Sequence, residues 1–338
     1  QDSTSTELVY SYALNDDDLE LKPSRLLPDL PCEIMAAAAR PAILHPLLAH
    51  YANAETRLEE ETLYLPLAAD IEVKGGSSLL TNQAMCPFRA FAIARLHATE
   101  LKPLQFGLPA AAVGSCVHRA LEFFWEQISS SAELATTAPE QLTTLVSEAV
   151  RQALRQTARH YPHTMTPRFI TLEQERLSAL LQLWLLEEHK RGSFQRLHAE
   201  QGFSWQHSRL ELSLRIDRID SDSAGNSVII DYKTGRPQSI NWEAERQDMP
   251  QLMLYLQAVE QSGKFKPVSA LLYAYVNIEK PGYDGIGISS EIHPGIALEE
   301  KKNLSTADWN TLKHGWEQSL QALAQEYLDG YVAVAPLK

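Results

Sequence analysis

The chain has 338 residues, 44% of them hydrophobic and 22% charged, and its formal net charge at neutral pH is −13. This length suffices for one large domain or two ordinary ones. The acidic balance argues against a basic coat that binds nucleic acid without specificity, although a local basic groove would suffice for a nucleic-acid-processing enzyme. No apolar run approaches the roughly 18 residues of a membrane span and no signal peptide is visible, so we expect a cytoplasmic protein without membrane contact.

Residues 1–75 are the least informative part of the chain. The stretch "NDDDLELKPSRLLPDLP" is acidic and interrupted by prolines, which is typical of an extended connector. Residues 42–61 carry apolar side chains at helical spacing and predict one helix. Because the chain begins with Gln1 rather than Met, we expect it to be a piece of a longer protein, with residues 1–75 as a lead-in from a preceding region.

Helical patterns dominate the next part of the chain. Gly75 and Gly76 interrupt the pattern before a helix that Pro87 ends or kinks. Another helix follows Gly114, and two long helical segments follow at about 140–160 and 171–191. We therefore predict a large α-helical insertion over about residues 130–195. A strand-like run from Ser193 onward then leads into a hairpin.

The hairpin lies in "RLELSLRIDRIDSDSAGNSVIIDYKTG", where two apolar runs flank a polar, glycine-containing turn. If the strands are antiparallel about position 224, Asp217 and Asp231 are cross-strand neighbours. Lys233 shares a face with Asp231, and Tyr232 points to the other face. Glu211 has the same parity as Asp217, and we expect either an auxiliary acid or a solvent-facing side chain there. The hairpin thus brings two carboxylates and an ammonium into one small volume.

This grouping suits phosphodiester hydrolysis. That reaction needs a divalent cation to offset charge on the phosphoryl oxygens and to acidify the attacking water. Two carboxylates suit Mg²⁺ or Mn²⁺, and a lysine can position the water and stabilise the transition state. The alternative is a set of surface charges on an amphipathic hairpin, which a lone D-x-K pattern would favour. The apolar run before Asp231 argues against a solvated face.

After the hairpin, Gln251 and Tyr255 lie one helical turn apart and face the same direction. Periodicity alone leaves open whether this pair binds a ligand or is a helix-terminal glutamine beside a half-buried tyrosine. "PVSALLYAYVNI" predicts a buried strand. Residues 281–287 predict a turn, "ISSEIHP" a short edge strand, and Thr306 to Leu328 a closing helix.

Taken together, these motifs resemble those of the PD-(D/E)XK nucleases, in particular their RecB-like branch. That branch has an I-D-R-x-D strand, then D-Y-K-T-G, then a helix with Q-x-x-x-Y, and upstream a G-x-x-x-H helix. The residues that match these motifs are Gly114, His118, Ile216, Asp217, Arg218, Asp220, Asp231, Tyr232, Lys233, Thr234, Gly235, Gln251 and Tyr255. The resemblance extends over about Gly76 to Val334, and AddB-type helicase-nuclease subunits share it.

The resemblance implies an α/β fold with a restriction-endonuclease-like core, a mixed central sheet flanked by helices, over residues 76–338. It implies a metal-dependent DNA nuclease, specifically an exonuclease, that acts in DNA repair or recombination with Mg²⁺ or Mn²⁺. DNA is then a partner, and a helicase subunit or a fused helicase-like region is another. The alternative is a non-catalytic DNA-binding or scaffold module of a helicase–nuclease complex.

The resemblance also assigns roles to residues of this chain. Asp217, Asp231 and Lys233 would be catalytic. The metal ligands would be His118, Asp217, Asp231 and the Tyr232 carbonyl. Substrate contacts would come from Gln251, Tyr255, Thr234 and Arg218, although the resemblance also favours a structural pair of Arg218 with Asp220.

Cysteine usage bears on one further cofactor. The three cysteines, Cys32, Cys86 and Cys116, are too few and too scattered for a disulfide framework or a zinc site. In AddB-like members, a cysteine in the setting of Cys86 ligates an iron–sulfur cluster, whose other ligands lie in a C-terminal tail. The tail here resembles the stretch before those ligands and stops at Lys338. One thiolate cannot hold a cluster, so we expect no iron–sulfur cluster in this chain and a buried, apolar Cys86.

Overall fold

The computed structural model describes residues 15, 16, 19, 20, 22, 63–68, 70–100, 107–301, 304 and 308–337. The chain divides into two units, Gln1–Glu60 and Glu61–Lys338. In the first unit the described strands are β1 (Asn15–Asp16) and β2 (Leu19–Glu20), which pair antiparallel. The helix predicted over residues 42–61 lies outside the described residues.

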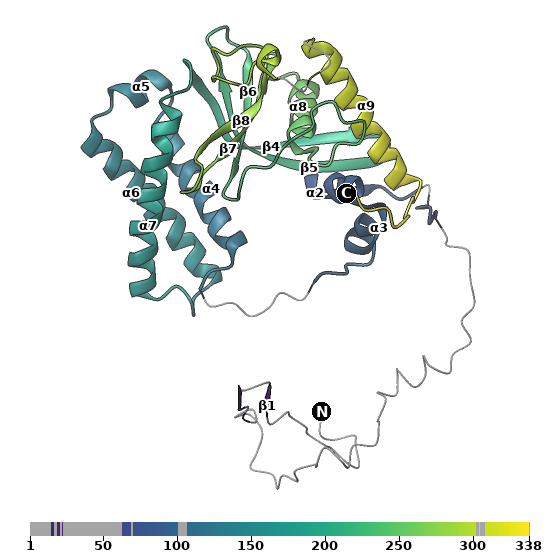
Figure 1. Ribbon diagram of the computed structural model, residues 1–338, viewed down its shortest axis with the longest axis horizontal. Helices are drawn as coiled ribbons and strands as arrows, with labels where there is room; N and C mark the ends of the chain where they lie inside the picture. The colour runs from purple at the N-terminus through teal and green to yellow at the C-terminus, as the bar shows by residue number, and fades with distance from the viewer. Residues whose placement is uncertain are drawn as a thin grey trace. The chain divides into compact units, whose positions relative to one another are not determined.

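The second unit is built around a mixed sheet, which has six strands among the described residues. They are β3 (Val73–Gly75), β4 (Gln195–His207), β5 (Leu210–Ser221), β6 (Ser227–Lys233), β7 (Val268–Tyr275) and β8 (Gly282–Gly287). The order is β3-β5-β6-β7-β8, and β4 pairs with β5 along its length. The pairs β3–β5 and β6–β7 are parallel and the other pairs are antiparallel (Figure 1). The C-terminal end of the long strand β5 lies between β4 and β6.

Helices cover both faces of this sheet (Figure 1). They are α2 (Ser77–Met85), α3 (Pro87–Ala90), the π-helical turn η2 (Phe91–Arg95), α4 (Ala110–Gln127), α5 (Ser131–Thr136), α6 (Pro139–His160), α7 (Pro167–Glu188), α8 (Gln251–Ser262), the 3₁₀ turn η3 (Leu298–Glu300) and α9 (Trp309–Leu328). The mixed sheet flanked by helices confirms the predicted fold class, and α5 to α7 occupy the predicted insertion. None of the described helices is both long and apolar enough to cross a membrane.

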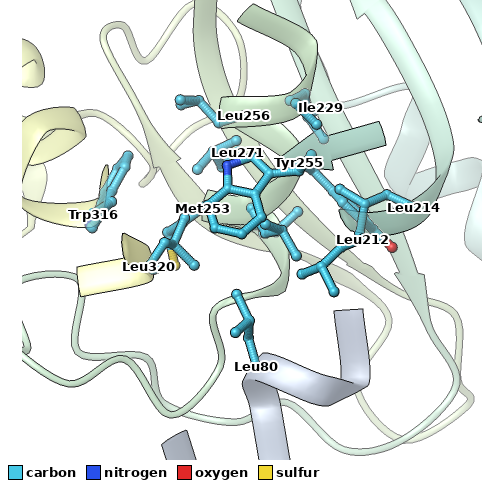
Figure 2. Close-up of a cluster of buried hydrophobic side chains, with 14 of the residues drawn as sticks. Leu80, Leu212, Leu214, Ile229, Met253, Tyr255, Leu256, Leu271, Trp316 and Leu320 are labelled. Carbon is cyan, nitrogen blue, oxygen red and sulfur yellow. The ribbon is translucent and has the colours of Figure 1, made fainter. Parts of the chain in front are cut away.

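Two buried apolar clusters hold the helices to the sheet. The α8-side core joins α2, α8 and α9 to one face and includes Leu80, Leu212, Ile229, Tyr255, Leu271 and Trp316 (Figure 2). The α4-side core joins α4, α6 and α7 to the other face and includes Val117, Phe124, Trp184, Val228, Tyr232 and Leu272. Alternate residues of β6 enter different cores, as the alternation of side chains along a strand requires.

The β5–β6 hairpin has the predicted register. Arg218 pairs with Ile230 and Ile219 pairs with Ile229. Continued by one residue, this register sets Asp217 opposite Asp231. Gly225 lies in the turn with a φ of 82°, a conformation that glycine adopts at little cost.

Two predictions about strands are wrong. The run from Ser193 is not one strand but the β4–β5 hairpin, which turns at Ser208, a residue with a left-handed φ of 52°. At the other edge of the sheet, the predicted turn over 281–287 is strand β8, and "ISSEIHP" contains no strand. A side chain at Gly285 would collide with the Leu271 carbonyl, so the glycines of β8 permit its close pairing with β7.

A network of buried charges lies between α7 and the hairpin. The guanidinium of Arg218 binds Asp220 at 2.7 Å and Glu188 at 3.0 Å, and that of Arg191 binds the same two carboxylates at 2.8 Å. The Arg218 guanidinium also stacks 3.6 Å from the centroid of the Trp125 ring. Arg218 is 0% exposed. Its predicted substrate contact is therefore wrong, because two carboxylates and an indole enclose the group.

Removing one member of this network should destabilise the fold. We expect Asp220→Ala to lower the free energy of unfolding by about 3–5 kcal/mol, because two buried guanidinium groups would then share one carboxylate. Denaturant titration followed by tryptophan fluorescence measures this change. As a control, Glu279→Ala breaks an ion pair with Arg236 whose side chains are 70% and 84% exposed, and it should cost less than about 1 kcal/mol. Equal losses in the two variants would contradict a special role for the buried network.

Candidate active site and metal centre

Asp217 lies at the centre of the candidate site. Its carboxylate is buried, with Oδ1 3.2 Å from Nδ1 of His118. Its Oδ2 accepts a hydrogen bond of 2.7 Å from the Tyr232 backbone N–H. Asp217 thus connects helix α4, which carries His118, to the end of strand β6, which carries Asp231 and Lys233.

Asp231 and Lys233 belong to a hydrogen-bonded chain that ends in the α8-side core. Lys233 Nζ lies 2.7 Å from Asp231 Oδ2 and donates to Gln251 Oε1 at 2.8 Å. Gln251 Nε2 donates to Asp231 Oδ1 at 2.9 Å and to the Tyr255 hydroxyl at 2.7 Å. Tyr255 is 3% exposed and packs among apolar side chains of the core (Figure 2). Gln251 therefore holds the carboxylate and the ammonium in fixed relative positions.

Helix α4 approaches the end of β6 closely at Gly114, one turn before His118. A Cβ at this position would lie 3.3 Å from the Thr234 hydroxyl, which is tighter than an ordinary contact. The His118 ring meets the Tyr232 ring edge-on, with 6.0 Å between the centroids. In the G-x-x-x-H motif, the glycine thus lets α4 lie close to the end of β6, and the histidine one turn later contacts Asp217.

Glu200 joins this site, although the sequence pattern did not indicate it. Ligand atoms of His118, Glu200 and Asp217 all lie within 4.8 Å of one another, as required of groups that share one ion. Glu200 is on β4, where Ala199 pairs with Arg218 and Gln201 with Ile216, so it lies opposite Asp217. The sequence does place the acidic residue Glu200 upstream of Asp217. Only the turn at Ser208, however, makes its strand β4 a neighbour of Asp217.

A cavity of about 380 Å³ opens at these residues. His118, Glu200 and Asp217 line it, together with Arg119 and Arg215. Arg215 pairs with Glu200 and lies 3.6 Å from Glu122, which lines the same cavity. The cavity is therefore lined both by side chains that can bind a metal ion and by arginine side chains.

The other predicted residues have different surroundings. The Tyr232 side chain is buried in the α4-side core, and coordination by its carbonyl stays a prediction. Cys86 is half-buried near the C-terminal segment, with Sγ 4.0 Å from the Ala333 carbonyl. Glu211 binds the Ser204 hydroxyl at 3.0 Å. Its side chain is 46% exposed, in keeping with the solvent-facing alternative.

Crowded negative charge shifts the pKa values at this site. Burial, followed by the charge of Asp217, raises the pKa of Asp231 to about 6 although Lys233 acts against this. Burial and Asp217 also raise the pKa of Glu200. Burial lowers the pKa of His118, but its hydrogen bond to Asp217 and the surrounding carboxylates outweigh burial and raise it. Carboxylates and an imidazole that together favour an added positive charge are a fitting ligand set for a divalent cation.

The raised pKa of Asp231 predicts how metal-free stability depends on pH. The folded protein retains this proton to about pH 6, whereas an unfolded aspartate loses it near pH 4, so the folded state binds more protons between these values. Stability should consequently fall as the pH rises from 4 to 6. We expect Asp231→Asn to be more stable than the wild type at pH 7 by about 1–3 kcal/mol in EDTA and to lose much of this pH dependence. Chemical denaturation between pH 4 and pH 8 tests this, and an unchanged slope in the variant would contradict it.

A search of curated proteins found no match. Among solved structures, the chain is similar to a candidate exonuclease from Eubacterium rectale, with 11% identity, a TM-score of 0.33 and coverage of 80% of this chain and 88% of that one. It is also similar to SSO0001, with 14% identity, a TM-score of 0.22 and coverage of 72% and 84%. Superpositions this loose carry no argument about function.

The family model is more informative. The model that describes the PD-(D/E)XK nuclease superfamily matches residues 78–338, which include every residue of the site described above. With most of its length matched, the chain belongs to the PD-(D/E)XK nuclease superfamily.

Proposed function

We propose that this protein is a metal-dependent deoxyribonuclease of the RecB-like branch, an exonuclease that hydrolyses DNA phosphodiester bonds in repair or recombination. The convergence on Asp217 carries the proposal. This carboxylate contacts the imidazole from α4 and the backbone of β6, where Asp231 and Lys233 are held together. Acidic ligands, an ammonium and an arginine-lined cavity in one place are suited to a phosphodiester.

His118, Asp217 and Asp231, with the Tyr232 carbonyl, would hold Mg²⁺ or Mn²⁺. When bound, such a cation offsets charge on the phosphoryl oxygens and lowers the pKa of the attacking water. Gln251 and Lys233 occupy Asp231 on one side and keep its carboxylate in a fixed orientation. A fixed orientation is what a ligand or base needs to act without reorganisation.

Lys233 supplies positive charge where the reaction develops negative charge. An ammonium has three donors, and its bonds to Asp231 and Gln251 account for two of them. The side chain is partly exposed, so a third donor can reach an attacking water or a phosphoryl oxygen. Lys233 would thus position the water and stabilise the pentavalent transition state.

Gln251 is a positioning residue that acts through Asp231 and Lys233. Tyr255 in turn holds Gln251, and its burial leaves it little surface for a substrate. We therefore place Tyr255 behind the site rather than in contact with DNA. Thr234, beside Gly114, stays a candidate for a direct substrate contact.

The nuclease proposal predicts loss of cleavage when the site is altered. Wild-type protein should degrade linear DNA with Mg²⁺ or Mn²⁺ and not in EDTA. Asp231→Asn and Lys233→Ala should each lower kcat by about 10²–10³-fold, because each removes a preorganised charged group. Gel analysis of end-labelled single- and double-stranded DNA measures the rates, and a covalently closed circle and an RNA of the same sequence test the exonuclease and DNA assignments.

Glu211→Gln is a matched control, because it neutralises a carboxylate on β5 that lies outside the site. It should cleave DNA like the wild type. Equal product from the wild type, Asp231→Asn and Lys233→Ala would end the nuclease proposal. DNA binding without cleavage in all of them would favour the non-catalytic scaffold.

A second test separates positioning from substrate contact. Tyr255→Phe removes the hydroxyl that holds Gln251 and keeps the ring in the core. We expect kcat to fall about three- to tenfold, since a net hydrogen bond contributes about 0.5–1.5 kcal/mol, with KM unchanged. A raised KM at unchanged kcat would instead show that Tyr255 contacts the substrate.

A further inference from the structure

Three carboxylates stand in a row across three neighbouring strands. Asp217 on β5 faces Asp231 on β6 by the register of one ladder and Glu200 on β4 by the register of the other. Like charges directly opposite each other destabilise a sheet. Lys233 offsets the charge of Asp231, but it lies on β6, whereas Glu200 lies on β4, on the other side of β5. The pair of Glu200 with Asp217 therefore calls for another source of positive charge.

Glu200 is held in an unusual way for a surface acid. Its side chain is 9% exposed, and its backbone has a left-handed φ of 52°. That conformation is unfavourable for a residue other than glycine, and it persists where the surroundings impose it, most often at functional sites. The ligand atoms of Glu200, His118 and Asp217 all lie within 4.8 Å of one another.

Arg215 alone does not account for this arrangement. Its side chain is 58% exposed, so solvent screens its attraction to Glu200. Its guanidinium is also shared with Glu122. Arg119, the other arginine of this cavity, hydrogen-bonds to Gln156, so two arginines face the carboxylates of Glu122, Glu200 and Asp217. An ion pair with Arg215 thus leaves net negative charge at the cavity wall.

We propose that Glu200 is a direct ligand of the divalent cation, together with His118 and Asp217. This inference rests on the proposed function and adds to the site a carboxylate from β4 that lies outside the four sequence motifs. An additional carboxylate makes the site more negative and favours a hard divalent cation. Arg215, which shares Glu200 with that cation, then provides positive charge at the wall of the same cavity.

The test is Mn²⁺ binding to the metal-free full chain, measured by calorimetry and by electron paramagnetic resonance, without DNA. Glu200→Gln should weaken Mn²⁺ binding at least about tenfold, since even residues that only support ligands cost about ten- to a hundredfold. Glu200→Asp keeps the charge but shortens the side chain, and it should also weaken binding. If Glu200→Asp binds Mn²⁺ like the wild type and Glu200→Gln is only slightly weaker, the carboxylate acts through its charge and the inference fails.

Matched controls separate coordination from the local field. Glu122→Gln removes a charge from the same cavity wall, at a residue that contacts Arg215 but is not in the ligand group. It should weaken Mn²⁺ binding much less than Glu200→Gln, and equal effects would overturn the inference. Arg215→Gln should leave binding unchanged or tighten it, because it removes a competing cation. If Arg215→Gln weakens binding as Glu200→Gln does, the ion pair is what matters and Glu200 is not a ligand.

Asp217→Asn distinguishes this inference from the proposed function. If Asp217→Asn loses both Mn²⁺ binding and cleavage while Glu200→Gln binds Mn²⁺ like the wild type, the inference fails and the nuclease proposal stands. If the wild type binds no Mn²⁺, both fail. Thermal unfolding in EDTA shows whether each variant is folded, and a Glu200→Gln variant that is folded but impaired in binding supports coordination.

Discussion

Mutual repulsion of carboxylates in a small, poorly solvated space is the constraint on which this site depends. Asp217 and Asp231 are buried, Glu200 is nearly so, and adjacent strands place them opposite one another. Such a cluster opposes folding unless positive charge enters it. The pKa of Asp231 is raised for the same reason, because burial and the charge of Asp217 favour the protonated carboxyl group. Under the proposed function a divalent cation would relieve this repulsion, and the stability that the chain gives up here would then be the source of metal affinity.

The rest of the fold holds these repelling groups in place. Gln251 binds Asp231 and Lys233, and Tyr255 fixes Gln251 from within the α8-side core. On the other side, Gly114 lets α4 come close enough for His118 to reach Asp217. Each polar group of the site is therefore supported by a regular element packed on the sheet, and rigid elements hold a site more precisely than loops do.

Sequence reasoning succeeded where one local pattern determines the geometry. The hairpin register follows from two apolar runs about a polar turn, and it set Asp217 opposite Asp231. It missed Glu200, because the Ser208 turn has no strong turn signal and the partner of Asp217 on β4 was hidden in an apparently continuous strand. The shift of alternation between Ile216 and Ile219, which both enter the α8-side core, likewise depends on packing.

Arg218 does not contact substrate, because the motif residues of the β5–β6 hairpin lie on two different faces of the sheet. Asp231 and Lys233 point to the side of α8, whereas Arg218, Asp220 and Tyr232 enter the α4-side core and its charge network. A slip of one residue in β5 would turn Arg218 toward the site and Asp217 toward Trp125, and the network would lose one of its two guanidinium groups. The pairing of Arg218 with Asp220 and Glu188 therefore favours the alignment that brings Asp217 opposite Asp231. Under the proposed function, the I-D-R-x-D motif would thus serve chemistry through its first aspartate, whereas its arginine and second aspartate help to fix the strand register.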